Sequence, residues 1–282
     1  MSRGNNPIEK LHFKVLAPFR ADVPRVLAGA RVNEQLHSKF IFEIQIVRGL
    51  ALRELGNIAT QLLPDGRHYQ PIDFHSWHVL LHNDEGRVMG CARYRPVTGG
   101  FDQLGASQSA IAYSNRYGPL LKAAVESHIR SAKKNKIQYG EAGCWALRRE
   151  IRGCTAAVNI ALMTWTLAHH LGGGMGLTTA SRTNHSASIL RRLGAHRLAD
   201  LPAYYEPKFG SIIEILAFNK DHLDVRFAAR LEKLKSEICQ LPIICASDAP
   251  ASSGESVPSG VPALPPYQIP EIGGHAVQPL LN

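Results

Sequence analysis

The fold is decided by residues 139–157, which read YGEAGCWALRREIRGCTAA. They predict a strand that ends at Leu147, then a charged turn, then a helix that begins near Thr155. The first backbone N–H groups of a helix have no partner within it and carry partial positive charge, so they bind phosphate well. Small residues at this helix start let an anion approach the backbone, and three arginines lie beside them: Arg148, Arg149 and Arg152. The stretch therefore predicts a pyrophosphate-binding turn.

Strands and helices alternate on both sides of this stretch. Periodicity predicts strands at 11–16, 78–82, 88–94, 137–147, 177–180 and 211–218. It predicts helices at 33–55, 119–134, 155–171 and 186–193, and a last helix with Asp221 as its N-cap. Gly172, Gly173 and Gly174 are expected to break the third of these helices. The pattern is typical of a mixed α+β protein with a single sheet.

The composition is that of a globular protein. The chain has 282 residues, of which 45% are hydrophobic and 20% charged, and this excludes collagen-like and fully disordered chains. No run approaches the roughly 18 to 20 apolar residues of a membrane span, and the polar N-terminus lacks the apolar segment of a secretory signal. The five cysteines form no C-x-x-C pair, so we expect reduced thiols in a cytoplasmic protein, without disulfides or a metal site.

Charge and composition change at residue 246. Residues 246–282 contain seven prolines and four glycines, no Lys or Arg, and three acidic residues, which predicts a disordered tail. Because the whole chain carries a formal net charge of +9, the part before the tail carries +12. A basic domain indicates an acidic partner, such as nucleic acid, anionic lipid, a phosphorylated cofactor or an acidic protein. Nucleic acid is not favoured, because the sequence has no zinc-ligand spacing, recognition helix or aromatic-interleaved basic strand.

The strand, turn and helix, with the later helix that closes on Leu193-Gly194, resemble the GCN5-related N-acyltransferases. The usual signature of that family, Arg/Gln-x-x-Gly-x-Gly/Ala, is read here as Arg152-Gly153-Cys154-Thr155-Ala156-Ala157, with Thr155 in place of a glycine. The resemblance covers about residues 11–220. It implies one acyltransferase domain over residues 8–240, with a mixed, mostly antiparallel, twisted central sheet flanked by helices.

The resemblance also implies where an acyl-phosphopantetheine donor binds. The backbone of Trp145, Ala146 and Leu147 would hold the pantetheine arm, and the signature residues would hold the pyrophosphate. Asn184 is the nearest match to an asparagine that often contacts the donor. Many acetyl-transferring members carry a tyrosine general acid, and Leu190 stands at that position here. No tightly bound cofactor is expected, since the donor is a co-substrate.

A narrower resemblance is to acyl-homoserine-lactone synthases and bacterial N-acyl amino acid synthases, which take fatty acyl groups from acyl carrier protein. The features that carry it are Arg48, Asp73, Gly90-Cys91-Ala92-Arg93, Glu141 four residues before Trp145, and the insertion 96–136. Cys144 stands where the homoserine-lactone enzymes usually have an arginine, which favours an amino acid or another amine as acceptor.

These likenesses imply roles for five further residues. Glu141 is the candidate proton acceptor from the attacking amine, since a carboxylate serves as a general base. Asp73 and Arg93 would orient the amine and the carboxylate of the acceptor, and Arg148 and Arg149 would dock an acidic carrier protein. Two alternatives stay open: an acetyl-CoA-dependent N-acetyltransferase of a small molecule or protein, and a non-catalytic protein that binds a thioester or a partner.

Overall fold

A computed structural model describes residues 10–19, 21–27, 29–54, 56 and 62–246. The expected tail beyond Ala246 lies outside the described residues. Within them, no helix combines the length and the apolar character that crossing a lipid bilayer requires.

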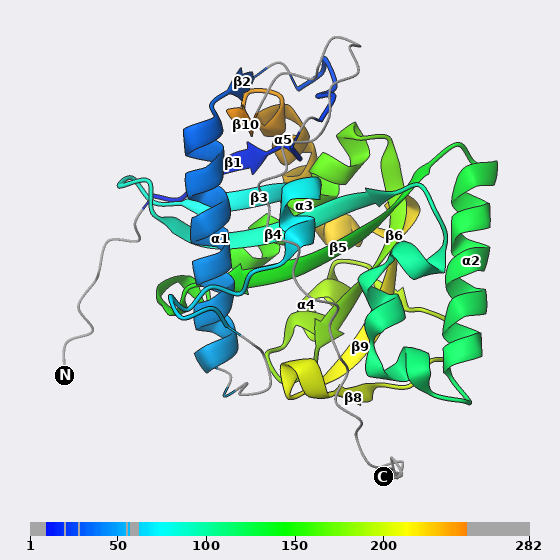
Figure 1. Cartoon of the computed structure of the whole chain (residues 1–282). Helices are drawn as coiled ribbons and strands as arrows, with labels where there is room; N and C mark the ends of the chain where they lie inside the picture. Colours follow the sequence, from blue (N-terminus) through cyan, green and yellow to red (C-terminus); the bar gives the residue numbers. More distant parts are fainter. Residues whose placement is uncertain (1–9, 20, 28, 55, 57–61, 247–282) are drawn as a thin grey trace, which may run out of the picture. The chain divides into compact units, whose positions relative to one another are not determined.

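One sheet organises these residues (Figure 1). Its strands are β1 His12–Leu16, β2 Ala30–Val32, β3 Trp77–His82, β4 Val88–Val97, β5 Gln138–Leu147, β6 Gly173–Ser181, β7 His196–Arg197, β8 Tyr204–Glu206, β9 Ser211–Asn219 and β10 Ile243–Cys245. They follow the order β2-β10-β1-β3-β4-β5-β6-β9-β7, with β8 also paired to β9. The pairs β2/β10, β10/β1 and β5/β6 are parallel and the others antiparallel. This confirms the expected mixed, mostly antiparallel sheet, which includes β10, beyond residue 240.

Helices cover both faces of the sheet. They are α1 Glu34–Glu54, α2 Gly118–Lys134, α3 Ala156–His170, α4 Ser186–Arg192 and α5 Ala228–Ile238. Figure 1 shows α1 and α2 on one face and α3 and α5 on the other. Successive side chains of a strand point to opposite faces. Accordingly Val79 and Leu81 of β3 pack in the core beneath α3, while Leu80 packs beneath α1.

Two expectations about element boundaries are wrong. The strand expected at 177–180 already begins at Gly173, directly after the glycine that ends the α3 region, and a Cβ added at Gly173 would clash with the Tyr94 hydroxyl. The last helix begins at Ala228 and not at Asp221, since two short 3-10 turns come first and Asp224 accepts from the Arg226 N–H. Four strands of two or three residues, β2, β7, β8 and β10, are too short to show a period in the sequence.

The feature that matters most for function is the divergence of β5 from β6. The two strands pair only from Gln138 to Ala142, and the rest of β5 pairs with β4 alone. Gly176 of β6 lies so close to β5 that an added Cβ would clash with the carbonyl oxygen of Gly140 and the ring of Phe218. Small residues therefore hold the two strands together at one end, and the sheet opens at the other.

Gly176→Ala should lower the free energy of unfolding by about 2 to 3 kcal/mol, because the backbone of β5 must move to admit the methyl group. Urea denaturation monitored by circular dichroism measures this loss. Gly143→Ala is the matched control, since no atom lies within 4 Å of a Cβ added at Gly143. Equal stability of the two variants would contradict the close contact between β5 and β6.

Candidate active site

A cavity of about 420 Å³ lies where β5 and β6 diverge. Its wall includes Trp145, Trp165 and Phe218, which pack on the α3 side of the sheet. It also includes Ala146 from the α1 side and Tyr204 from the α2 side. Since side chains from both faces form one wall, the cavity passes through the sheet.

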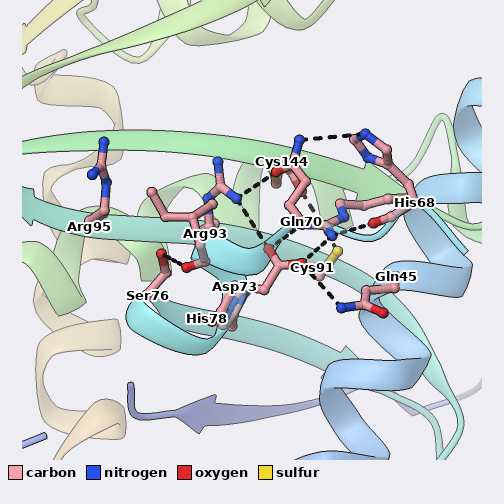
Figure 2. Close-up of polar contacts among 12 residues, drawn as sticks. Gln45, His68, Gln70, Asp73, Ser76, His78, Cys91, Arg93, Arg95 and Cys144 are labelled. Carbon is pink, nitrogen blue, oxygen red and sulfur yellow. Dashed lines mark hydrogen bonds and ion pairs between the residues drawn. The ribbon is translucent and has the colours of Figure 1, made fainter. Parts of the chain in front are cut away.

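A buried ion pair lies beside this cavity (Figure 2). Arg48 of α1 donates to both carboxylate oxygens of Asp73, at 2.6 and 2.5 Å, and to the carbonyl oxygen of His68 at 2.7 Å. Asp73 is fully buried in a short 3-10 helix, Pro71–His75, and its backbone carbonyl oxygen lies 2.8 Å from His78 Nε2. The two-point geometry is the strongest that a carboxylate and a guanidinium can form.

Arg93 of β4 extends this pair to the cavity wall. Its Nη1 donates to Asp73 Oδ1 at 3.1 Å and to Gln70 Oε1 at 2.7 Å, and Cys144 Sγ lies 3.5 Å from the same Gln70 oxygen. Arg93, Gln70 and Cys144 line the cavity, whereas Asp73 does not. Asp73 therefore holds the two arginines in place and is not itself part of the cavity wall. Two guanidinium groups against one carboxylate leave one excess positive charge at this end of the cavity.

Burial sets the protonation of the groups around this pair. Burial alone would raise the pKa of Asp73, but the hydrogen bonds and charge of Arg48 lower it below its ordinary value. Burial lowers the pKa of His78 to about 4, and burial together with the charge of Arg48 lowers that of His68 to about 4. Near neutral pH both imidazoles are uncharged, so the excess positive charge belongs to the guanidinium groups.

A β-bulge bends β5 at the cavity. Cys91 of β4 faces Ala146 of β5, and Arg93 faces Gly143. The single residue Ala92 of β4 is therefore opposed by two residues of β5, Cys144 and Trp145. Cys144 adopts a positive φ of 53°. A bulge leaves its extra residue outside the ladder of backbone hydrogen bonds, which turns that part of the backbone toward other partners.

Glu141 lines the cavity on β5 and is held by three donors. Its Oε2 accepts from Arg95 Nη2 at 2.9 Å and from the Gly105 N–H at 3.0 Å, and its Oε1 accepts from the Ala106 N–H at 3.3 Å. The carboxylate is thus fixed in one position against the cavity. Its role as a proton acceptor stays a prediction.

The residues predicted to bind the acyl donor fall into two groups. Trp145, Ala146 and Asn184 line the cavity, and so does Leu190 of α4, at the position where the resemblance places a tyrosine in many acetyltransferases. Leu147 and the signature turn 152–157 lie outside the cavity wall.

The signature turn has the expected local form. Gly153 has a φ of 81°, and α3 begins at Ala156 after Thr155, whose side chain caps no N–H group. Arg152 points back along the chain, because its Nε and Nη2 donate to the Leu147 carbonyl oxygen at 2.9 and 2.8 Å and its Nη1 lies 2.6 Å from Glu54. The arginine therefore fixes the turn against the end of β5, with part of its surface exposed.

The two predicted docking arginines differ in their surroundings. Arg148 is half-buried and donates from Nε to the Val88 carbonyl oxygen at 2.7 Å, whereas Arg149 is exposed. Both line a shallow depression with Arg87 and Glu150. Arg149 is thus the more accessible of the two for a partner protein.

Two residues of this site carried no signal in the sequence. Gln70 joins Arg93 to Cys144, and Glu206 of β8 lines the far part of the cavity. Gln70 precedes Pro71, which starts the helix that carries Asp73, and this proline is the one local sign that the segment is rigid.

No family model and no curated protein matches the sequence. Among solved structures, the chain is similar to a CoA-dependent acyl-homoserine lactone synthase, BjaI, with SAM and isopentyl-CoA, at 15% identity and a TM-score of 0.50, over 86% of this chain and 96% of that one. A second CoA-dependent acyl-homoserine lactone synthase, MesI, gives 14% identity and a TM-score of 0.50, over 80% and 95%. The N-acyl amino acid synthase FeeM gives 11% and 0.44, over 76% and 92%.

The chain has the acyl-homoserine lactone synthase fold. This confirms the fold expected from the signature turn and its flanking elements. Within this fold, the present chain joins its cavity through the sheet to the buried ion pair of Arg48 and Asp73.

His78→Gln should flatten the pH dependence of stability between pH 6.5 and 4. Because the folded pKa lies below the unfolded one, the unfolded chain binds the proton first, so stability is lost as pH falls through this window. The free energy of unfolding that the native protein loses through His78 across this window is about 3 kcal/mol. Urea denaturation at several pH values measures the slope. His75→Gln, an exposed change on the same short helix, should keep the native slope, and equal slopes in both variants would contradict the prediction.

Proposed function

We propose that the protein is an N-acyltransferase, which moves an acyl group from an acyl carrier protein or CoA thioester to the primary amine of an amino acid or similar small molecule. The observation that carries this proposal is the cavity through the sheet, which joins an apolar part along α3 to the positively charged end at Arg93. An acyl thioester and a charged acceptor need these two environments, side by side, in one site.

The apolar part suits a medium or long acyl chain. Trp145, Trp165, Leu190 and Phe218 line it, and each buried methylene group contributes about 0.8 kcal/mol to binding. Leu190 supplies no hydroxyl group, so the tyrosine-assisted chemistry of the acetyltransferase alternative has no support at this position. BjaI, whose fold this chain shares, has a structure with isopentyl-CoA and SAM, so the fold admits a CoA derivative together with a second small molecule.

The charged end suits the carboxylate of the acceptor. Arg93 lines the cavity and uses Nη1 for Asp73 and Gln70, and the guanidinium fork has further N–H groups on its other nitrogens. Asp73 acts as a positioning residue, since Arg48 occupies both of its oxygens. An acceptor held by its carboxylate at Arg93 places its amine toward the middle of the cavity.

The reaction is attack of this amine on the carbonyl carbon of the thioester. A tetrahedral oxyanion forms, the C–S bond then breaks, and the pantetheine sulfur leaves as a thiolate. A backbone N–H freed from the ladder by the bulge at Cys144 is the candidate donor to the oxyanion. Glu141 takes the proton of the amine, directly or through water, and the thiolate takes a proton from solvent.

The donor phosphates are proposed to bind at the signature turn. Gly153, Cys154 and Thr155 lead into α3, which begins with Ala156 and Ala157, and Arg152 lies beside them. The partial positive charge of the helix start favours phosphate there. The pantetheine arm would then run along Trp145, Ala146 and Leu147 toward the cavity, past Asn184. The donor is acyl carrier protein or CoA, and carrier protein is proposed as a partner that a cytoplasmic enzyme would meet in the cytoplasm.

Lipid extracts of cells that express the protein should contain new N-acylated amines, which mass spectrometry identifies by the mass of the acyl chain and the acceptor. Glu141→Gln should lower their amount by about 100-fold or more, as expected when a general base is lost. Glu85→Gln, an exposed change in the β3–β4 hairpin, should leave the products unchanged. The enzymatic function would be contradicted if the extracts contained no new products although the protein is folded and binds acyl-CoA.

Arg149→Glu should raise the apparent KM for acyl carrier protein roughly tenfold, because an exposed cation next to the donor site steers an acidic partner. The KM for a small acyl thioester should not change. Lys133→Glu, at the exposed end of α2, is the matched charge reversal. An equal rise for both donors would show that Arg149 does not act in docking.

A further inference from the structure

A segment between β4 and α2 closes one end of the cavity. Residues 101–113, here called the strap, form three short 3-10 helices, Phe101–Gln103, Gly105–Gln108 and Ala110–Tyr113. Apolar side chains of the strap, among them Phe101, Leu104 and Ile111, are buried in the core on the α2 side of the sheet. Gly105, Gln108 and Ser109 form part of the cavity wall.

Glu141 attaches the strap to one side of the opening in the sheet. Its carboxylate accepts from the N–H groups of Gly105 and Ala106, which are the first two residues of the second strap helix. Arg95 binds the same carboxylate and also donates to the Gln103 carbonyl oxygen. The N–H groups at a helix start have no partner within the helix, so a carboxylate there stabilises it.

Glu206 attaches the strap to the other side. Its Oε2 accepts from the Ala110 N–H at 2.8 Å, at the first residue of the third strap helix, and Lys208 Nζ donates to the Gln108 carbonyl oxygen at 2.6 Å. Glu206 is buried and lies on β8, which pairs with β9 and through it with β6. One carboxylate thus stands on β5 and the other on the β6 side, with the strap between them.

We propose that Glu141 and Glu206 clamp the strap across the opening between β5 and β6, and that the clamped strap sets the longest acyl chain the cavity admits. The inference rests on the proposed function. A donor that enters along α3 sends its acyl chain through the sheet, and the strap lies at the opposite face. Glu206 is a positioning residue, and Glu141 combines this role with that of the candidate base.

Two variants weaken the clamp, and both are measured by amide exchange and ligand binding, which need no turnover. Glu206→Gln weakens one attachment without changing a residue assigned to the reaction. Gly105→Ala keeps both carboxylates, but its Cβ would lie 3.0 Å from Glu141 Oε1 and displace that carboxylate. Glu85→Gln is the matched control. Glu85 is exposed in the β3–β4 hairpin, which lies at the opposite end of β4 from the strap.

Hydrogen–deuterium exchange of the full chain tests the attachment. In Glu206→Gln, the amides of residues 101–113 should exchange at least about tenfold faster than in the native protein, since the strap opens more often. Exchange in α3 should not change. Unchanged exchange in the strap of both Glu206→Gln and Gly105→Ala would overturn the clamp.

Binding of octanoyl-CoA and palmitoyl-CoA tests the chain-length role. Quenching of the cavity tryptophans, Trp145 and Trp165, reports the two Kd values. The ratio of the palmitoyl to the octanoyl Kd should fall in both variants, by about fourfold for each methylene group that the loosened strap newly admits. An unchanged ratio despite faster exchange would overturn the chain-length role. If the native protein binds neither these CoA thioesters nor the same acyl groups on acyl carrier protein, the proposed function fails, while the exchange rates still decide the clamp.

Discussion

The divergence of β5 from β6 is the constraint on which the rest of the structure depends. Backbone contact between Gly140 and Gly176 holds the strands together at one end. Beyond Ala142 the ladder stops, the bulge at Cys144 bends β5, and the cavity passes through the sheet. A regular ladder would have filled this space with backbone hydrogen bonds. The opening is therefore a consequence of where small residues and one extra residue lie in two strands.

The opening is stable because polar groups at its edges satisfy one another. Arg48 and Asp73 form a buried pair, and removal of one partner from such a pair costs about 3 to 5 kcal/mol. Glu141 with Arg95, and Glu206 with the strap, act similarly on the other side. Each charged side chain that faces the cavity is thus fixed by neighbours. A site with fixed charges loses little free energy to reorganisation when a substrate binds.

The two ends of the site depend on different kinds of interaction. In the proposed function, the excess positive charge at Arg93 binds the carboxylate of the acceptor, whereas the wall of Trp145, Trp165 and Phe218 along α3 binds the acyl chain by its apolar area. Specificity for the acceptor and for the acyl chain is therefore separable. Changes in the strap should alter specificity for the acyl chain without altering specificity for the acceptor.

The sequence by itself determined the longer helices and strands and their order. The periodicity of α1, α3 and β3, the left-handed Gly153 and the small residues after it are local properties, so they could be predicted from neighbours along the chain. Glu141, Trp145, Asn184 and Arg93 were expected from the resemblance to known acyltransferases, and all four line the cavity. The start of β6 at Gly173 could not be predicted, since Gly173 joins the strand by pairing with Gln138 of β5, in close contact with Tyr94 and α3.

Only the tertiary structure decided which groups meet. Asp73 lies behind Arg93 because Arg48, 25 residues earlier, takes both of its oxygens. Gln70 meets Cys144, and Glu206 meets Ala110, across 74 and 96 residues. Such contacts leave no periodic trace in the sequence, because they arise when sheet pairing brings distant segments together. The residue types came from the sequence, and their positions around one cavity came from the divergence of two strands.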